Sequence, residues 1–171
     1  MSDQPDYGSR ARDWWLELQK DSAARARLLR CRTPLDALLV PQTFSLMQRL
    51  GWRGDRGERV AALAAVLAHV REDDTQRIAR AIGRATLKDA DTALLSEGRF
   101  RRLMTVRGAD ELQTAMTRLS AHLGGHVNVT DLANSMLWWT DRTRANWAYG
   151  YYAATGANSA STENTQGAAN G

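Results

Sequence analysis

The sequence has 171 residues, enough for one ordinary domain whose core needs no disulfide for its stability. It carries 23 Lys and Arg against 19 Asp and Glu, a formal net charge of +4, and Cys31 is its single cysteine. These numbers exclude an intrachain disulfide and a zinc site with four cysteine ligands. The longest apolar run, residues 60–70, is too short for a membrane helix, and the first ten residues do not have the pattern of a signal peptide. We therefore expect a cytoplasmic protein that does not enter a membrane.

The first third of the chain predicts short helices. Residues 9–21 form an amphipathic pattern with Ser9 as a candidate N-cap, and residues 22–31 continue it. Two prolines then interrupt the pattern, and the second begins a short helix over residues 41–50 that ends at Gly51. A loop over the next six residues separates this helix from the following element.

The helical pattern continues along the rest of the chain. Residues 55–71 place apolar side chains at three- and four-residue spacing, and residues 75–85 and 109–125 repeat such spacing. The last long helix is predicted over residues 131–152, with Thr130 as its N-cap.

No segment shows the alternating Val, Ile and Thr pattern of hairpin strands. The sequence therefore predicts an all-α domain over residues 1–153, built as one or two helical lobes. Residues 154–171 consist almost entirely of small and polar residues without apolar periodicity, and this composition predicts a disordered tail.

Nearly all of the positive charge is arginine, because Lys20 and Lys88 are the only lysines. Guanidinium groups bind phosphate bidentately, but a GC-rich genome explains the arginine bias equally well. The densest group lies in the stretch RFRRLMTVRG, residues 99–108. On a helical wheel its apolar side chains share one side and the first three arginines point outward, while Arg107 comes near the helix end, where it can cap carbonyl groups. This surface is either a solvated basic face or a binding surface for an anion.

The final predicted helix carries two aromatic stripes. The first should pack inward and consists of Leu132, Met136, Trp139, Thr143 and Trp147. The second consists of Trp138, Arg142, Ala145, Tyr149 and Tyr152. Two stripes require two partners, either a second lobe of the same chain or another molecule. We assign Trp138, Tyr149 and Tyr152 as a candidate subunit interface.

The order and spacing of several segments resemble the CasB family, the small subunit of the type I-E CRISPR surveillance complex Cascade. The segments are RARLLRC, FSLMQRLGW, RFRRLMTVRGADELQTAMTRLSAHL and MLWWTDRTRANWAYGYY. No single one of them is diagnostic, and the resemblance extends from about Trp14 to Tyr152.

This resemblance implies a non-catalytic, all-α subunit without a cofactor or a metal. Its implied partners are a second copy of itself, the backbone and large subunits of the complex, the guide RNA, and the target and non-target DNA strands. The family's basic segments hold nucleic acid through phosphates, and they map onto Arg27, Arg30, Arg99, Arg101, Arg102, Arg107, Arg142 and Arg144.

Other functions have weaker support in the sequence. A transcriptional regulator would need a recognition helix, for which residues 75–85 are the best candidate, although no convincing helix and short turn precede them. A scaffold subunit would use the second stripe to bind protein only. His122 and His126 have the spacing of zinc ligands, but the two glycines between them end the helix, so the side chains need not share a face and a zinc site is not favoured. Asp89, Asp91 and Glu97 fit a charged loop better than a metal-nuclease site.

Overall fold

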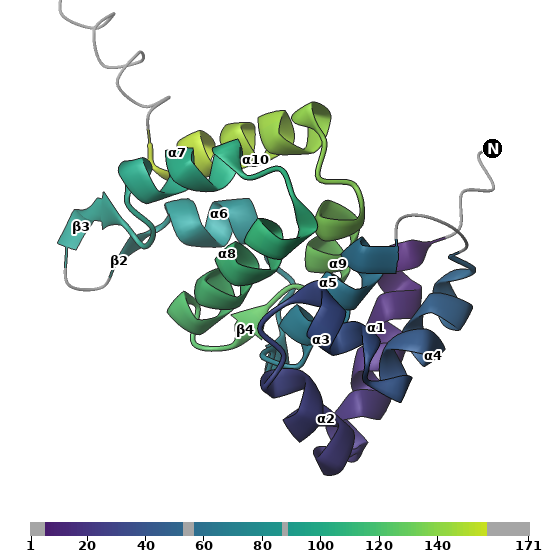
Figure 1. Ribbon diagram of the computed structural model, residues 1–171. Helices are drawn as coiled ribbons and strands as arrows, with labels where there is room; N and C mark the ends of the chain where they lie inside the picture. Colours follow the sequence, from purple (N-terminus) through teal and green to yellow (C-terminus); the bar gives the residue numbers. More distant parts are fainter. Residues whose placement is uncertain (1–5, 53–56, 87–88, 157–171) are drawn as a thin grey trace, which may run out of the picture.

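The computed structural model describes residues 6–52, 57–86 and 89–156, and these ranges hold ten helices and four short strands (Figure 1). The helices are α1 Tyr7–Lys20, α2 Ser22–Leu29, α3 Pro34–Leu38, α4 Pro41–Leu50, α5 Gly57–Leu67, α6 Ile78–Gly83, α7 Glu97–Thr105, α8 Ala109–His122, α9 Val129–Leu137 and α10 Asp141–Ala154. Strand β1, Glu72–Asp73, pairs in parallel with β4, His126–Val127, and β2, Ala85–Thr86, pairs antiparallel with β3, Asp89–Ala93. The all-α prediction is confirmed.

Helix α5 forms the centre of the core. Every residue from Val60 to Ala68 is buried, and α3, α4, α8 and α9 all pack against this helix. Alanine supplies half of its sequence from residue 60 onward, so neighbouring helices approach it closely on all sides. Figure 1 shows α1–α4 gathered at one end of the molecule and α6, α7 and α10 at the other.

Two close helix crossings depend on glycine. A Cβ atom at Gly8 in α1 would lie 2.5 Å from Thr130 Cγ2, at the start of α9. A Cβ atom at Gly83, the last residue of α6, would lie 2.5 Å from the carbonyl oxygen of Tyr151 in α10. Both distances are far below van der Waals contact, so a larger residue would push the helices apart.

The helix starts near the N-terminus differ from the prediction. The first helix begins at Tyr7 rather than after Ser9, because the Asp6 carboxylate accepts a hydrogen bond from the Ser9 amide at 3.0 Å and acts as the N-cap. Helix α3 was not predicted as a helix. It starts with a capping box, in which the Thr33 and Asp36 side chains each accept a hydrogen bond from the other residue's amide.

The prediction of one long helix over residues 131–152 is wrong, because the chain leaves the helical conformation between Trp138 and Thr140 and forms α9 and α10. The Thr143 hydroxyl donates to the Trp138 carbonyl, and the Thr140 hydroxyl caps α10 by accepting from the Thr143 amide. These bonds satisfy the groups that a helix break leaves without partners. Asn128, rather than Thr130, caps α9.

Helix α10 includes Ala154, the first residue of the predicted tail, as its last residue, and the described residues continue to residue 156. The rest of the predicted tail, residues 157–171, lies outside the described residues. In the described ranges, no helix combines the length and the apolar character that crossing a bilayer requires.

Candidate nucleic-acid interface

Helix α7 separates its apolar and basic side chains as the helical wheel predicts. Phe100 and Leu103 are buried, and the Phe100 ring stacks on Tyr151 of α10 with ring centroids 4.0 Å apart. This packing fixes the rotation of α7 and turns Arg99 and Arg102 toward solvent. The side chains of both arginines make no hydrogen bond or ion pair with the described part of the chain, so their guanidinium groups are available to a ligand.

A groove of about 760 Å³ runs between α7 and α8. Arg99 and Arg102 line it from α7, and Arg118 and His122 line it from α8. Its apolar lining comes from Leu95, Leu103, Val106, Ala115 and Leu119. The basic side chains on both helices can bind phosphates at the edges of the groove. The apolar surface between the helices can contact the bases and sugars of the same strand.

The electrostatic character of the groove changes along its length. Asp110 and Glu111 belong to its lining and occupy the first turn of α8, where the positive end of the helix dipole favours carboxylates. A ring nitrogen of His122 contacts the Leu94 carbonyl oxygen. Three unpaired arginines outnumber two carboxylates, so the groove carries a positive balance.

Arg101 does not belong to the groove, because it leaves α7 on the side that faces α10. Its Nε lies 3.3 Å from Glu97 Oε1, and Tyr152 donates a hydrogen bond to the same carboxylate oxygen at 3.0 Å. The pKa of Arg101 is raised, first by its hydrogen bond with Tyr152 and second by the charge of Glu97. The structure therefore separates Arg101 from its neighbours, although all three are exposed.

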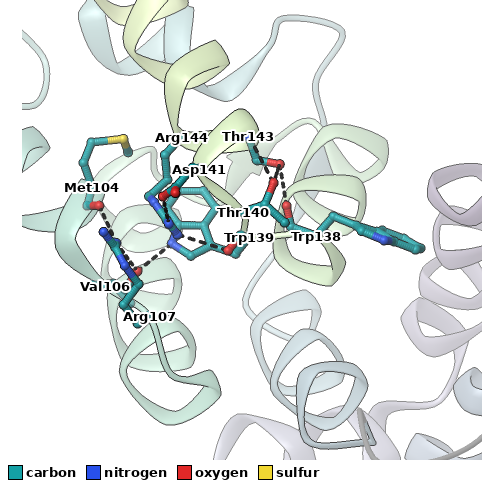
Figure 2. Close-up of polar contacts among 9 residues, drawn as sticks. All are labelled: Met104, Val106, Arg107, Trp138, Trp139, Thr140, Asp141, Thr143 and Arg144. Atoms are coloured by element: carbon teal, nitrogen blue, oxygen red, sulfur yellow. Dashed lines mark hydrogen bonds and ion pairs between the residues drawn. The ribbon is translucent and has the colours of Figure 1, made fainter.

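Arg107 caps the end of α7, as its position predicts (Figure 2). Its Nη1 donates to the carbonyl oxygens of Met104 at 2.9 Å and Val106 at 3.1 Å. The indole nitrogen of Trp139 donates to the same Val106 oxygen at 3.0 Å. Arg107 therefore helps to join the end of α7 to the start of α10, although it remains exposed.

Arg144 is a structural residue, because only 9% of it is exposed. Its Nη1 donates to the Trp139 carbonyl oxygen at 3.0 Å, and its Nη2 pairs with Asp141 Oδ1, as Figure 2 shows. The hydrogen bond from Arg144, followed by its charge, lowers the pKa of Asp141. With both contacts made inside the α9–α10 junction, Arg144 has little capacity left for a phosphate.

The remaining predicted basic residues lie on other surfaces. Arg142 is exposed at the start of α10 and has no hydrogen bond or ion pair with the described residues. Arg27 is exposed on α2 and Arg30 is exposed at its C-cap, and Figure 1 places α2 at the far end of the molecule from α7. Arg30 Nε donates to the Ala26 carbonyl oxygen of its own helix at 3.1 Å. The eight predicted arginines therefore do not form one continuous surface.

The predicted interface aromatics also separate. Trp138 is partly buried and packs against Tyr7 and Trp52 of the same chain, with ring centroids 4.8 and 5.3 Å away. Tyr152 is partly buried between α7 and α10. Tyr149 alone of the three remains open, with 75% of its surface exposed. The helix break separates Trp138 from the two tyrosines, which both lie on α10, and the contacts of Tyr152 with Phe100 and Glu97 of α7 separate it from Tyr149.

Arg118 lines the groove but is not among the eight predicted basic residues. It lies on the face of α8 opposite the predicted inner residues, so the same wheel argument that selected α7 would have placed it outward. Its pairing with Arg99 and Arg102 depends on the packing of α7 beside α8, which no local pattern specifies. Within the described ranges, no three His, Cys, Asp or Glu side chains form a group that fits a metal ion.

Comparison with known proteins supplies the family. The family model described as CRISPR-associated protein Cse2 matches residues 24–152, which is most of the chain and includes the whole α7–α8 groove. No curated protein matches the chain significantly.

Two solved structures share the fold. One is a chain in the crystal structure of E. coli Cascade bound to a PAM-containing double-stranded DNA target, with 22% identity, a TM-score of 0.63, and coverage of 88% of this chain and 96% of that chain. The other is CasB from Thermus thermophilus, with 24% identity, a TM-score of 0.63, and coverage of 90% and 99%. The family match over residues 24–152 shows that this chain belongs to the CRISPR-associated Cse2 family.

Proposed function

We propose that this chain is a non-catalytic subunit of a Cascade-type ribonucleoprotein and that its α7–α8 groove holds a nucleic-acid strand by its phosphates. The observation that carries this proposal is the set of three arginines, Arg99, Arg102 and Arg118, which line one groove and have no ion-pair partner among the described residues. Membership of the Cse2 family and the resemblance to a chain of a DNA-bound Cascade support the assignment.

The chemistry of this groove suits binding without sequence recognition. Guanidinium groups that contact phosphates position a strand but do not read its bases, and in RNA-guided complexes base pairing with the guide supplies the sequence. We infer that the groove stabilises the R-loop, the state in which guide RNA pairs with target DNA and the other strand is displaced. The inferred protein partners are a second copy of this chain and the backbone and large subunits.

The salt dependence of DNA binding tests the proposal. The chain is co-expressed with its neighbouring subunits and guide RNA, and the affinity of the purified complex for target DNA is measured over a range of salt concentrations. Each lost phosphate contact should reduce the slope of log K against log salt by about 0.7 for a single strand. The double variant Arg99→Gln and Arg102→Gln should therefore lower the slope by about 1.4 and weaken binding evenly across sequences.

A matched control removes two charges elsewhere. Arg10→Gln and Arg32→Gln change two exposed arginines on the end of the molecule that carries α1–α4, and they should leave the slope unchanged. Equal slopes for the groove variant and the wild type would contradict the proposal. Binding that depends strongly on sequence would favour a transcriptional regulator, although the candidate recognition helix α6 is only six residues long and ten residues separate it from the end of α5.

A further inference from the structure

A second hollow, of about 530 Å³, lies between α6 and α10, on a different pair of helices from the α7–α8 groove. Its lining consists of Arg77, Ala79, Arg80, Asp131, Asn146, Trp147, Tyr149, Gly150 and Ala153. Gly150 permits the close approach that forms its base, since a Cβ atom there would lie 3.1 Å from Ala79 Cβ. Small residues therefore leave a depression between the two helices that a side chain of another molecule can fill.

The charge on this hollow lies on its α6 side. Arg77 and Arg80 are exposed, and no hydrogen bond or ion pair joins either side chain to the described residues, although the charge of Arg77 acts on the nearby Asp131 carboxylate. Asp131 is the only carboxylate in the lining, and it accepts a hydrogen bond from the Ile78 amide at 2.9 Å. This hydrogen bond holds the carboxylate at the start of α6, and two guanidinium groups against one carboxylate leave the lining with a positive balance.

The opposite side of the hollow is uncharged and partly aromatic. Tyr149 stands on the α10 side with its ring largely exposed, and Asn146 lies one turn before it. The Trp147 indole nitrogen is already bonded to Ser135 Oγ at 2.9 Å, so this residue contributes apolar surface only. Exposed tyrosine and arginine around a small apolar depression are the residue types that dominate binding energy at protein–protein interfaces.

The arrangement fits a protein segment better than a nucleic-acid strand. A strand carries a phosphate at every nucleotide and needs cations along its path, as the two sides of the α7–α8 groove provide. Here both arginines stand on the α6 side, and the facing α10 side carries no charged side chain in the lining. A protein segment can place its own carboxylates against Arg77 and Arg80 and an uncharged side chain over the rest of the hollow.

We propose that the α6–α10 hollow docks a segment of a partner protein in which Asp or Glu stands beside an apolar side chain. This inference rests on one part of the proposed function, namely that the chain assembles with other proteins. It does not depend on nucleic acid in the α7–α8 groove.

Photo-cross-linking identifies what occupies the hollow. A benzophenone amino acid replaces Tyr149 in the chain co-expressed with its neighbouring subunits and guide RNA, and the purified complex is irradiated and analysed by mass spectrometry. The expected product joins position 149 to a peptide of another subunit that contains Asp or Glu. A product with RNA or DNA, or no product from a complex that contains the labelled chain, would overturn the proposal. The same label at Arg102 is the control for the groove.

Two charge-reversal variants separate this proposal from the proposed function. Arg77→Glu with Arg80→Glu and Arg99→Glu with Arg102→Glu each change the net charge by the same amount. The α6 variant should reduce the amount of this chain retained per complex by roughly tenfold, because its carboxylates repel those of the partner. The groove variant should be retained but bind DNA with a lower salt slope.

Folding of both variants is checked by their unfolding midpoints. If the α6 variant unfolds, the milder change Arg77→Gln with Arg80→Gln replaces it, with a smaller loss expected. Full retention of a folded α6 variant would refute the docking proposal and leave the groove proposal intact. Normal DNA binding by a retained groove variant would refute the groove proposal and leave the docking proposal intact.

Discussion

The α7–α8 groove and the α9–α10 junction are both rich in arginine, yet they use it in opposite ways. In the groove, Arg99 and Arg102 have no partner among the described residues. At the junction, Arg144 is buried against the Trp139 carbonyl and Asp141, and at the adjoining end of α7 Arg107 bonds to two carbonyl groups. The same residue type therefore stabilises the fold in one region and remains available to a ligand in the other.

The difference follows from where helices end. The end of α7 and the break between α9 and α10 leave carbonyl oxygens that no helical amide can reach. A guanidinium group can satisfy several of them at once, so Arg107 and Arg144 are held there. Arg99 lies near the start of α7, and although Arg102 lies in its last turn, the Thr105 hydroxyl donates to the carbonyl there, so neither guanidinium group binds a carbonyl of the described residues.

The largest expected effect is on stability, at the junction. Arg144→Met keeps the side-chain volume but removes the bonds to Trp139 and Asp141, and it should lower the free energy of unfolding by about 2 kcal/mol. Urea unfolding followed by tryptophan fluorescence measures this change, since Trp139 and Trp147 lie 5.2 Å apart beside the junction. Arg142→Met, two residues away and exposed, should change stability by less than about 0.5 kcal/mol. Equal stability for the two variants would contradict a structural role for Arg144.

The second largest effect is expected on the affinity of the α7–α8 groove for DNA. Arg118→Gln should weaken DNA binding by the assembled complex roughly fivefold at 0.1 M salt and reduce the salt slope by about 0.7, with unchanged stability. Arg118 extends the comparison, because it reaches the groove from α8 rather than α7. If its removal altered stability but not the slope, Arg118 would belong with the junction arginines.

Much of the fold was predictable because it depends on local patterns. The apolar spacing in residues 55–71 and 109–125 gave helices α5 and α8, and the glycine pair after α8 ends that helix with positive φ angles at both residues. The break at Trp138–Thr140 was missed because helical periodicity continues across it. A threonine that caps a helix and a threonine inside one look alike in a single sequence.

The candidate site was predictable only in part. The wheel placed Phe100 inward and the arginines of α7 outward, as observed. It did not show that Arg101 lies beside both Glu97 and Tyr152, which depends on α10 packing beside α7. It also did not show that Arg144 is buried, which depends on the helix break at Trp138–Thr140. The groups that bind Arg107 and Arg144, and the carboxylate that pairs with Arg101, lie within five residues of each in the chain, so sequence spacing alone does not show which arginines are free.

Asp131, which lies in the lining of the α6–α10 hollow, should make the free energy of unfolding depend on pH. Burial raises its pKa above the ordinary value of 3.8, although the bond from the Ile78 amide and the charge of Arg77 oppose this. The folded state therefore holds its proton more tightly than the unfolded state, so stability falls as pH rises from 3.8 through the raised pKa. Asp131→Asn keeps an acceptor for Ile78 and should flatten this part of the curve, with modestly higher stability at pH 7. Urea unfolding at several pH values measures it, and an unchanged curve would contradict the assignment.

The smallest effect is expected at Arg101, which tests whether position on α7 alone makes an arginine available. Arg101 is 75% exposed, more than enough to meet a phosphate, but its guanidinium is engaged with Glu97 and lies on the α10 side of the helix. Arg101→Gln should leave the salt slope of DNA binding unchanged, whereas Arg102→Gln, the adjacent residue, should lower it by about 0.7. Equal losses for the two variants would mean that a strand covers both sides of α7 and that the ion pair with Glu97 opens on binding. Unequal losses would show that the rotation of α7, fixed by the stacking of Phe100 on Tyr151, selects which arginines reach the ligand.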